Sequence, residues 1–318
     1  MAKRSHSNGR SNGHLAPARR SPGGAPVESA SPAGRLPVLK TYKIFIGGKF
    51  PRTESGRYYP LKSADGRALA NVCLSSRKDV RDAVVAARAA QAGWAKRTAY
   101  NRAQVLYRIA EMLEGRAAQF ADELAQCGVS PAAARREVQL SVDRTLYYAG
   151  WADKYQQVFS CVNPVASSHF NFSLLEPTGV VAVLAPESPA LLGLISTIIP
   201  AVCGGNAVVA LASHGAPLPA VTLAEVLATS DLPGGVINLL TGRRDELAEH
   251  FASHMDVNAV ITCGDADIDA RALQQRAADN MKRVVRWDRH DWLADDAQSP
   301  YFIADTQEVK TTWHPVGT

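Results

Sequence analysis

The chain has 318 residues, of which 46% are hydrophobic and 20% are charged, and its formal net charge is +5. This composition is typical of a soluble globular protein and excludes a collagen-like or wholly disordered chain. The longest apolar run, residues 191–202, is too short to span a bilayer and contains Ser196 and Thr197, so we expect no membrane partner.

The positive charge is concentrated in residues 1–40, which carry seven basic side chains and one acidic side chain. This segment is rich in Ser, Gly and Pro and has no apolar period, so we predict a disordered basic tail. The rest of the chain is close to neutral, which argues against a nucleic-acid partner for the folded part. Five cysteines without a CxxC pair argue against a disulfide framework or a zinc cluster and favour a cytoplasmic location.

Order is expected to begin at Thr41, with a strand over 42–46 that runs into the turn at Gly47 and Gly48. Ser76 is a candidate N-cap for the next helix, whose apolar residues recur at helical spacing. The other elements expected in this half are a helix from about 100 to 127, a helix from 131 to about 157 and an alternating strand over 170–174.

From Glu176 onward, short apolar segments alternate with longer segments that suit helices. The predicted strands are 180–184, 207–211, 235–239, 259–262 and 283–286, and the predicted helices are 191–202, 218–228, 247–254 and 268–281. Short strands joined by helices predict an α/β fold with a Rossmann-like parallel sheet that helices cover on both faces. Ligands of such sheets bind beyond the carboxyl ends of the strands.

Four motifs then occur in order: YKIFIGG at 42–48, EPTGVV at 176–181, GN at 205–206 and LPGGVINLLTG at 232–242. In this order they resemble the aldehyde dehydrogenase superfamily. The sequence EVKT at 308–311 resembles the C-terminal strand that those enzymes use for oligomerisation. The resemblance implies an N-terminal helical region and a cofactor-binding domain over 41–290, with a strand arm at 168–175. A linker and an oligomerisation strand would follow over 291–318.

The resemblance also implies a catalytic domain between the last strand of the sheet and the oligomerisation strand. Here the chain passes from Arg286 to Glu308 in about twenty residues, which we interpret as a deletion of that domain. Both parts of the arm remain, and the expected assembly residues are Phe170, Phe172, Val309, Thr311 and Trp313. The resemblance places the helix over 268–281 where the cofactor-binding domains of two subunits pack together, and there it would add apolar contacts through Leu273, Ala277 and Met281.

Aldehyde oxidation in this family needs a thiolate nucleophile, an amide that stabilises the oxyanion, a nicotinamide and a carboxylate that activates water. The thiol belongs to the missing domain, so no cysteine of this chain aligns with it. Cys203 and Cys263 are better interpreted as small buried hydrophobic residues.

The amide and carboxylate positions are also changed. Ser188 stands at the amide position, and Glu187 beside it would bring negative charge towards an oxyanion. Trp287 stands at the carboxylate position, and Asp288 reaches it only if the alignment shifts by one residue. We therefore predict no catalytic residue, and we interpret Ser188 and Trp287 as vestigial positions.

The positions that the resemblance assigns to the adenosine ribose depart from the family as well. Leu211 replaces a Lys that contacts the ribose, and His214 replaces the Glu that follows it. Ser213, between them, is a remaining candidate. Only weak binding of NAD(P), or none, is therefore expected.

The helix that should receive the pyrophosphate keeps Gly264 but carries Asp265, Asp267 and Asp269 at its start. We expect Asp265 to cap this helix and the aspartates together to occupy its free N–H groups and repel a diphosphate. Their spacing also resembles a calcium loop, but the sixth and twelfth positions lack the required Gly and Glu, so no metal site is predicted.

Three functions remain open at this stage. The leading hypothesis is a catalytically degenerate aldehyde dehydrogenase-like protein that serves as a structural or regulatory partner of a full-length aldehyde dehydrogenase, in a hetero-oligomer. The first alternative is an active NAD(P)-dependent aldehyde oxidoreductase, which needs a thiol from this chain or a neighbour. The second alternative is a nucleotide or metabolite sensor that kept the pocket without the reaction.

Overall fold

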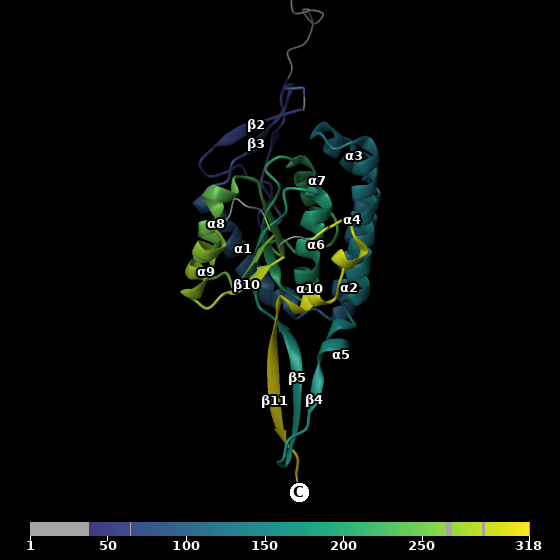
Figure 1. Cartoon of the computed structure of the whole chain (residues 1–318), viewed down its shortest axis with the longest axis vertical. Coiled ribbons are helices and arrows are strands. Elements are labelled where there is room, and N and C mark those ends of the chain that lie inside the picture. The colour runs from purple at the N-terminus through teal and green to yellow at the C-terminus, as the bar shows by residue number, and fades with distance from the viewer. Residues whose placement is uncertain (1–37, 64, 265–268, 288–289, 318) are drawn as a thin grey trace, which may run out of the picture. The chain divides into compact units, whose positions relative to one another are not determined.

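Figure 1 shows the computed structural model of the chain, which describes residues 38–63, 65–264, 269–287 and 290–317. The tail predicted over 1–40 lies almost entirely outside the described residues, as do Asp265 and Asp288. Contacts divide the chain into Met1–Val38 and Leu39–Thr318. Within the part that the structure describes, no helix is both long and apolar enough to cross a membrane.

A five-stranded parallel sheet lies at the centre of residues 39–318 (Figure 1). In the order β10-β9-β6-β7-β8, its strands are β10 (Arg283–Arg286), β9 (Ala259–Thr262), β6 (Val180–Leu184), β7 (Ala207–Leu211) and β8 (Ile237–Leu240). β6 and β7 contain only Val, Ala and Leu, and all their residues are buried, as in a parallel strand covered on both faces. The predicted α/β fold is confirmed. β8 starts later than predicted because Gly235, at φ +95°, belongs to the preceding turn.

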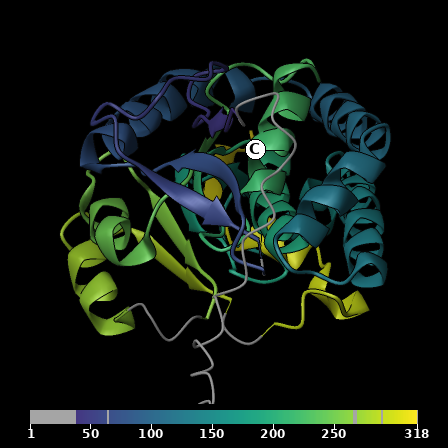
Figure 2. The same cartoon turned by 90° about the horizontal axis from the view of Figure 1, so that it is seen from above.

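Helices cover both faces of this sheet, as Figure 2 shows from above. Alternate strand residues, such as Val180 and Val209, pack with α1 (Arg77–Ala95), α8 (Arg244–Ser253) and α9 (Ala270–Ala278). The opposite set, such as Val181 and Val208, belongs to a larger core with the remaining long helices. These are α2 (Ala99–Glu114), α3 (Ala117–Gln126), α4 (Pro131–Trp151), α6 (Ala190–Cys203) and α7 (Leu218–Ala228).

The N-cap predicted at Ser76 is confirmed, whereas two of the predicted helix ends are wrong. Ser76 opens α1 with a capping box, in which its backbone N–H donates to Asp79 Oδ2 at 2.7 Å. The single helix predicted from about 100 to 127 is wrong, because Gly115 ends α2 before α3 begins. The helix predicted from 131 to 157 is also too long. It ends at Trp151, and a turn leads into α5 (Tyr155–Phe159), where Tyr155 is buried.

Two helices of the second half need similar corrections. α8 begins at Arg244, three residues earlier than predicted. α9 is shorter than the predicted 268–281, and its N-cap is Asp269 rather than Asp265. The Asp269 carboxylate accepts hydrogen bonds from the backbone N–H groups of Arg271 and Ala272, both at 3.0 Å.

A small sheet, in the order β1-β3-β2, lies before α1 and comprises β1 (Thr41–Tyr42), β2 (Tyr58–Lys62) and β3 (Ala68–Cys73). The strand predicted over 42–46 is therefore wrong beyond Tyr42. Phe45 makes only a single antiparallel bridge, with Leu239 at the edge of the central sheet. The β2–β3 hairpin was not predicted, because β2 contains Pro60 and mostly exposed residues that hide the alternation.

An arm projects from the body at the lower end of Figure 1. It is a three-stranded antiparallel sheet in the order β11-β5-β4, made of β11 (Gln307–Pro315), β5 (His169–Pro177) and β4 (Cys161–Asn163). β5 and β11 pair along their whole lengths, from Pro177 with Gln307 to His169 with Pro315. Chain segments more than a hundred residues apart thus form one unit.

Candidate functional site

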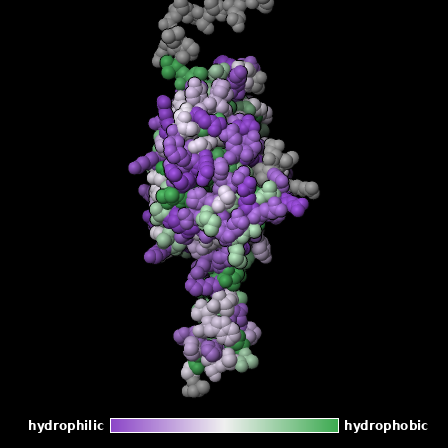
Figure 3. Space-filling view, turned by 90° about the vertical axis from the view of Figure 1, so that its left-hand side faces the viewer, coloured by the Kyte–Doolittle hydropathy of each residue, from purple (hydrophilic) through white to green (hydrophobic). Residues whose placement is uncertain are grey.

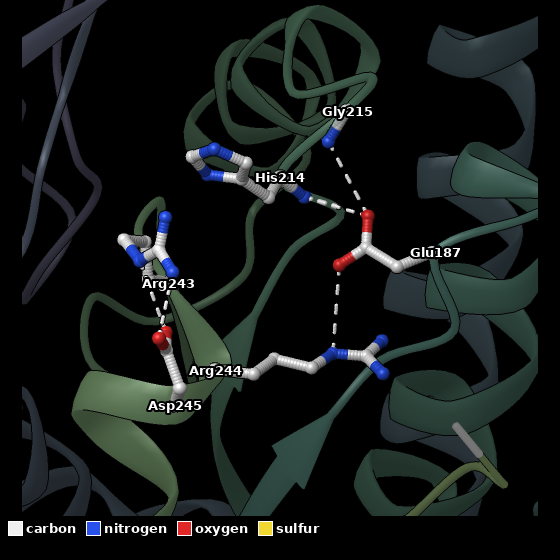
Figure 4. Close-up of a pocket in the computed structure, with 6 residues that line it drawn as sticks. All are labelled: Glu187, His214, Gly215, Arg243, Arg244 and Asp245. Carbon is white, nitrogen blue, oxygen red and sulfur yellow. Dashed lines mark hydrogen bonds and ion pairs between the residues drawn. The ribbon is translucent and has the colours of Figure 1, made fainter. Parts of the chain in front are cut away.

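A cavity of about 480 Å³ opens beyond the carboxyl ends of β6, β7 and β8, the edge where ligands of parallel sheets bind. Its lining comes from the three loops that follow these strands and comprises Glu187, His214, Gly215, Arg243, Arg244 and Asp245 (Figure 4). Among the described cavities, this one lies at the position expected for a cofactor.

The Glu187 carboxylate lies at the centre of this arrangement (Figure 4). Its Oε2 accepts hydrogen bonds from Ser213 Oγ at 2.8 Å and from the backbone N–H groups of His214 and Gly215 at 2.9 and 3.3 Å. Its Oε1 lies 3.5 Å from Nε of Arg244, whose side chain is only 5% exposed. The Glu187 carboxylate therefore joins its own loop, after β6, to the loop after β7 and to the first residue of α8.

The loop after β7 is held in place by further contacts. Ser213 Oγ accepts a hydrogen bond from the backbone N–H of Ala216 at 3.1 Å, which fixes the turn. The His214 ring stacks on Tyr59 with 4.4 Å between ring centroids, and the Tyr59 hydroxyl donates to the His214 carbonyl at 3.1 Å. Burial of Tyr59 raises the pKa of its hydroxyl, so this group stays a donor at physiological pH.

The rim of the cavity carries solvent-exposed ion pairs. Arg243 Nη2 lies 2.7 Å from the Asp245 carboxylate, and outside the lining of the cavity Arg57 Nη2 lies 2.9 Å from the carboxylate of Glu246. These groups are half-exposed and satisfy one another, so they contribute little to stability. Only Arg244, whose side chain is 5% exposed, is buried in its pair with Glu187, and this distinguishes it from the exposed arginines of the rim.

The predicted cofactor residues do not assemble into a dinucleotide site. Leu211 is buried in the core beneath α1, and Ser213 is occupied by Glu187. Gly264 is exposed after β9, and Asp269 occupies two N–H groups of α9 itself. Asp265 lies outside the described residues. Among the described residues, the donors after β7 and at the start of α9 are thus occupied by Glu187 and Asp269, which does not suit a dinucleotide.

The predicted vestigial positions are also far from a catalytic arrangement. Ser188 is exposed in the loop after β6. Trp287 is 3% exposed and belongs to the core, where its ring lies 4.6 Å from that of Phe302. Asp288 lies outside the described residues.

Neither cysteine is placed as a nucleophile. Cys203 is buried, its thiol donates to the Tyr148 carbonyl at 3.3 Å, and burial raises its pKa to about 12. Cys263 is buried at the end of β9. Among the described residues no group of three His, Cys, Asp or Glu side chains suits a metal ion.

The assembly residues divide into two groups. Phe170 and Phe172 lie on one face of the arm, 5.5 Å apart, while Thr311 hydrogen-bonds Ser173 on the other face at 2.8 Å. Val309 and Trp313 are well exposed on β11.

The expected contacts of α9 need a correction. Leu273 and Ala277 are buried within the chain, and only Met281 is exposed. The face seen in Figure 3, on the side of α8 and α9, is mostly hydrophilic.

Sequence reasoning missed the pairing of Glu187 with Arg244. Glu187 was considered only for its charge near an oxyanion, and Arg244 was not considered. One available signal is the pair of arginines directly after the strand that ends at Leu240, because cations at that edge of a parallel sheet face the ligand position.

Comparison with known proteins agrees with the motifs. The profile described as "Aldehyde dehydrogenase family" matches residues 51–286. Human retinal dehydrogenase 2 is 32% identical over 80% of this chain, and mouse cytosolic 10-formyltetrahydrofolate dehydrogenase is 30% identical over 79%. These matches cover 50% and 28% of the two relatives, so the chain spans half or less of the length of each.

Solved structures give the same result. The NAD+ complex of an aldehyde dehydrogenase from Bacillus cereus superposes with a TM-score of 0.74 at 25% identity, over 78% of this chain and 51% of that one. HpcC from Thermus thermophilus also gives 0.74, at 28% identity, over 78% of this chain and 48% of that one. The similarity therefore covers most of this chain but only about half of each related fold.

Proposed function

The chain belongs to the aldehyde dehydrogenase family, and from this premise we propose that it is a catalytically degenerate member that serves as a structural or regulatory partner of a full-length aldehyde dehydrogenase. The observation that carries this proposal is the arm. Nine residue pairs join β5 to β11, while the positions that would carry the chemistry hold unrelated groups.

The segment between β10 and β11 supports the loss of catalysis. In the family the catalytic domain would enter there, but here residues 290–306 form a packed bridge that includes η1 (Asp295–Ala297) and α10 (Tyr301–Ala304). The buried Arg144 of α4 donates to the carbonyls of Trp292 and Ala297 at 3.2 and 2.8 Å. A bridge with its own core contacts is consistent with a stable protein that does not need the catalytic domain to fold.

The arm supports the partnership. Among the described residues β11 pairs on one side only, with β5, and its exposed residues include Val309 at 67% and Trp313 at 57%. The other edge of this nine-residue strand is a template for strand addition, and proteins usually cover or block such an exposed edge. A full-length aldehyde dehydrogenase offers the sheet edge that this arm pairs with in the family, and this chain has no equivalent to offer in exchange.

Co-expression with a full-length aldehyde dehydrogenase from the same source tests the proposal. We expect the two chains to co-elute in gel filtration with light scattering. Deletion of residues 308–318, or the double change Val309→Asp and Trp313→Asp, should abolish this complex, because both remove strand addition. Val85→Asp is the matched control, since it charges an exposed residue of α1 on the body, outside the expected assembly residues, and should leave the complex intact.

Two outcomes would contradict the partnership: a truncated chain that still co-elutes, or an intact chain that stays monomeric beside every such homologue. Activity is measured in parallel as NADH formation from aldehydes. The chain alone should show none. Turnover that disappears in a Cys263→Ser or Cys203→Ser variant would favour the active oxidoreductase instead.

A further inference from the structure

The hydrogen bonds at the two ends of the pair β5–β11 show which backbone groups of β11 point away from β5. At one end the Thr178 N–H donates to the Thr306 carbonyl at 3.2 Å, and at the other the Val316 N–H donates to the Ser168 carbonyl at 3.0 Å. In an antiparallel pair, successive residues turn their N–H and C=O groups alternately towards the paired strand and away from it. No register shift interrupts the pairing between these two bonds. The even-numbered residues of β11 therefore bond to β5.

The odd-numbered residues Val309, Thr311 and Trp313 consequently turn their N–H and C=O groups to the outer edge of β11. Within the part of the chain that the structure describes, no strand pairs with this edge (Figure 1). The three side chains share one face of the arm, because side chains alternate along a strand. Val309 is 67% exposed and Trp313 is 57% exposed. The edge thus combines unpaired backbone groups with a β-branched, a hydroxyl and an aromatic side chain.

This edge is complementary to the same edge of a second copy of the chain. Antiparallel pairing about a two-fold axis at Thr311 sets Thr311 opposite its own counterpart and Val309 opposite Trp313 of the second copy. Threonine with threonine and β-branched with aromatic side chains are favourable cross-strand pairs. The same register sets Glu308 opposite His314 of the second copy, so that a carboxylate faces an imidazole. A two-fold axis repeats each of these contacts, as in other isologous dimers.

The two neighbouring registers are less favourable. An axis at Lys310 sets the two lysines directly opposite each other, and like charges in that position destabilise a sheet. An axis at Thr312 sets Val309 opposite Pro315, which has no N–H to donate. With the axis at Thr311, Lys310 faces Thr312 and neither problem arises.

We infer that two copies of this chain pair through β11 about a two-fold axis at Thr311, which joins their arms into one continuous sheet. A closed pair of this kind covers an edge that would otherwise be a template for aggregation. The homodimer does not depend on the proposed partnership with a full-length aldehyde dehydrogenase. It occupies the same edge, so such a partner has to displace the second copy.

The test mixes two charged variants of the full chain in the absence of any other protein. Sedimentation equilibrium first gives the concentration at which the wild type is mainly dimeric. At that concentration Val309→Lys alone and Trp313→Glu alone should be monomeric, because each sets a charge opposite an apolar side chain. In an equimolar mixture the introduced ammonium and carboxylate face each other, so dimers with one copy of each variant should return. Their return also shows that both variants are folded.

The matched control is an equimolar mixture of Val309→Lys with Thr311→Glu. It brings together the same two charges, but these positions face each other only if the axis lies at Lys310. The control mixture should therefore remain monomeric.

A wild type that stays monomeric at every attainable concentration would overturn the inference. A wild-type dimer that both charged variants retain would do the same, because it would form through another surface. Dimers restored in the control mixture but not in the mixture of Val309→Lys with Trp313→Glu would exclude the axis at Thr311. None of these results bears on the proposed partnership, which is measured separately by co-elution with a full-length aldehyde dehydrogenase.

Discussion

The indole nitrogen of Trp287 donates a hydrogen bond to Oδ2 of Asp305 at 2.8 Å, which joins the first residue after β10 to the last turn before β11. The Trp287 ring also packs against the rings of Phe302 and Trp292, with 4.6 and 6.3 Å between ring centroids. The segment between β10 and β11, where the family has its catalytic domain, thus packs around an aromatic cluster of Trp287, Trp292 and Phe302. Trp287, which the resemblance places at the position of the water-activating carboxylate, thus lies in the core.

Replacement of Trp287 by Ala should therefore destabilise the chain strongly. We expect a loss of about 3–5 kcal/mol in the free energy of unfolding, as for other large buried aromatic residues. Trp313→Ala is the matched control, because the same side chain is 57% exposed there and should cost well under half as much. Urea unfolding of both variants measures the difference, and equal losses would show that the bridge is not a core element.

The buried carboxyl of Glu137 should make stability depend on pH. Glu137 Oε1 accepts hydrogen bonds from the backbone N–H groups of Leu191 and Leu192 at 2.7 and 3.2 Å, but desolvation by burial outweighs these bonds and raises its pKa above the ordinary 4.5. The protonated Glu137 carboxyl therefore contributes fully to the free energy of unfolding below pH 4.5. This contribution is lost as the pH rises through the raised pKa that Glu137 has in the folded state.

A Glu137→Gln variant tests this pH dependence, because its amide oxygen still accepts both N–H bonds but does not ionise. Its free energy of unfolding should lack the decline that the wild type shows on raising the pH from 4.5. An identical pH profile for the two proteins would contradict the assignment. Asp82→Asn, at an exposed position of α1, serves as the control for charge removal.

Thiol reactivity should separate Cys161 from Cys203. Cys161 is exposed on β4 of the arm and should react with a thiol reagent at pH 8 in the native protein. Cys203 should stay unmodified until the chain unfolds, because it is buried and its pKa is raised to about 12. Mass spectrometry after timed labelling reads both sites. Rapid labelling of native Cys203 would reopen the possibility of a nucleophilic thiol in this chain.

NAD should bind weakly, in the high micromolar range or worse, because carboxylates of the chain occupy the donors at the ends of β7 and α9. Calorimetry should show tighter binding in a Glu187→Ala, Asp269→Gly double variant. The change Leu211→Lys, which the family pattern suggests, should instead destabilise the fold, since Leu211 is completely buried. Tight NAD binding by the unaltered chain would contradict this reasoning and favour the sensor.

Sequence alone determined the central sheet. The strands at 180–184, 207–211, 259–262 and 283–286 were predicted to the residue, because short apolar runs between helices have few other solutions in a parallel sheet. The same pattern predicted the edge of the sheet at which ligands bind, and the motifs indicated the family. Prediction from the sequence failed where local signals conflict, as at Gly115, where one apolar stripe continues through the end of a helix.

Only the tertiary structure decided what fills the site and the bridge. Glu187, Ser213 and Arg244 follow three different strands, and they meet because the carboxyl ends of parallel strands share one edge of the sheet. Trp287 is buried because the segment after it folds back over its ring. Such contacts depend on how distant loops close in space, and no periodicity within one segment records them.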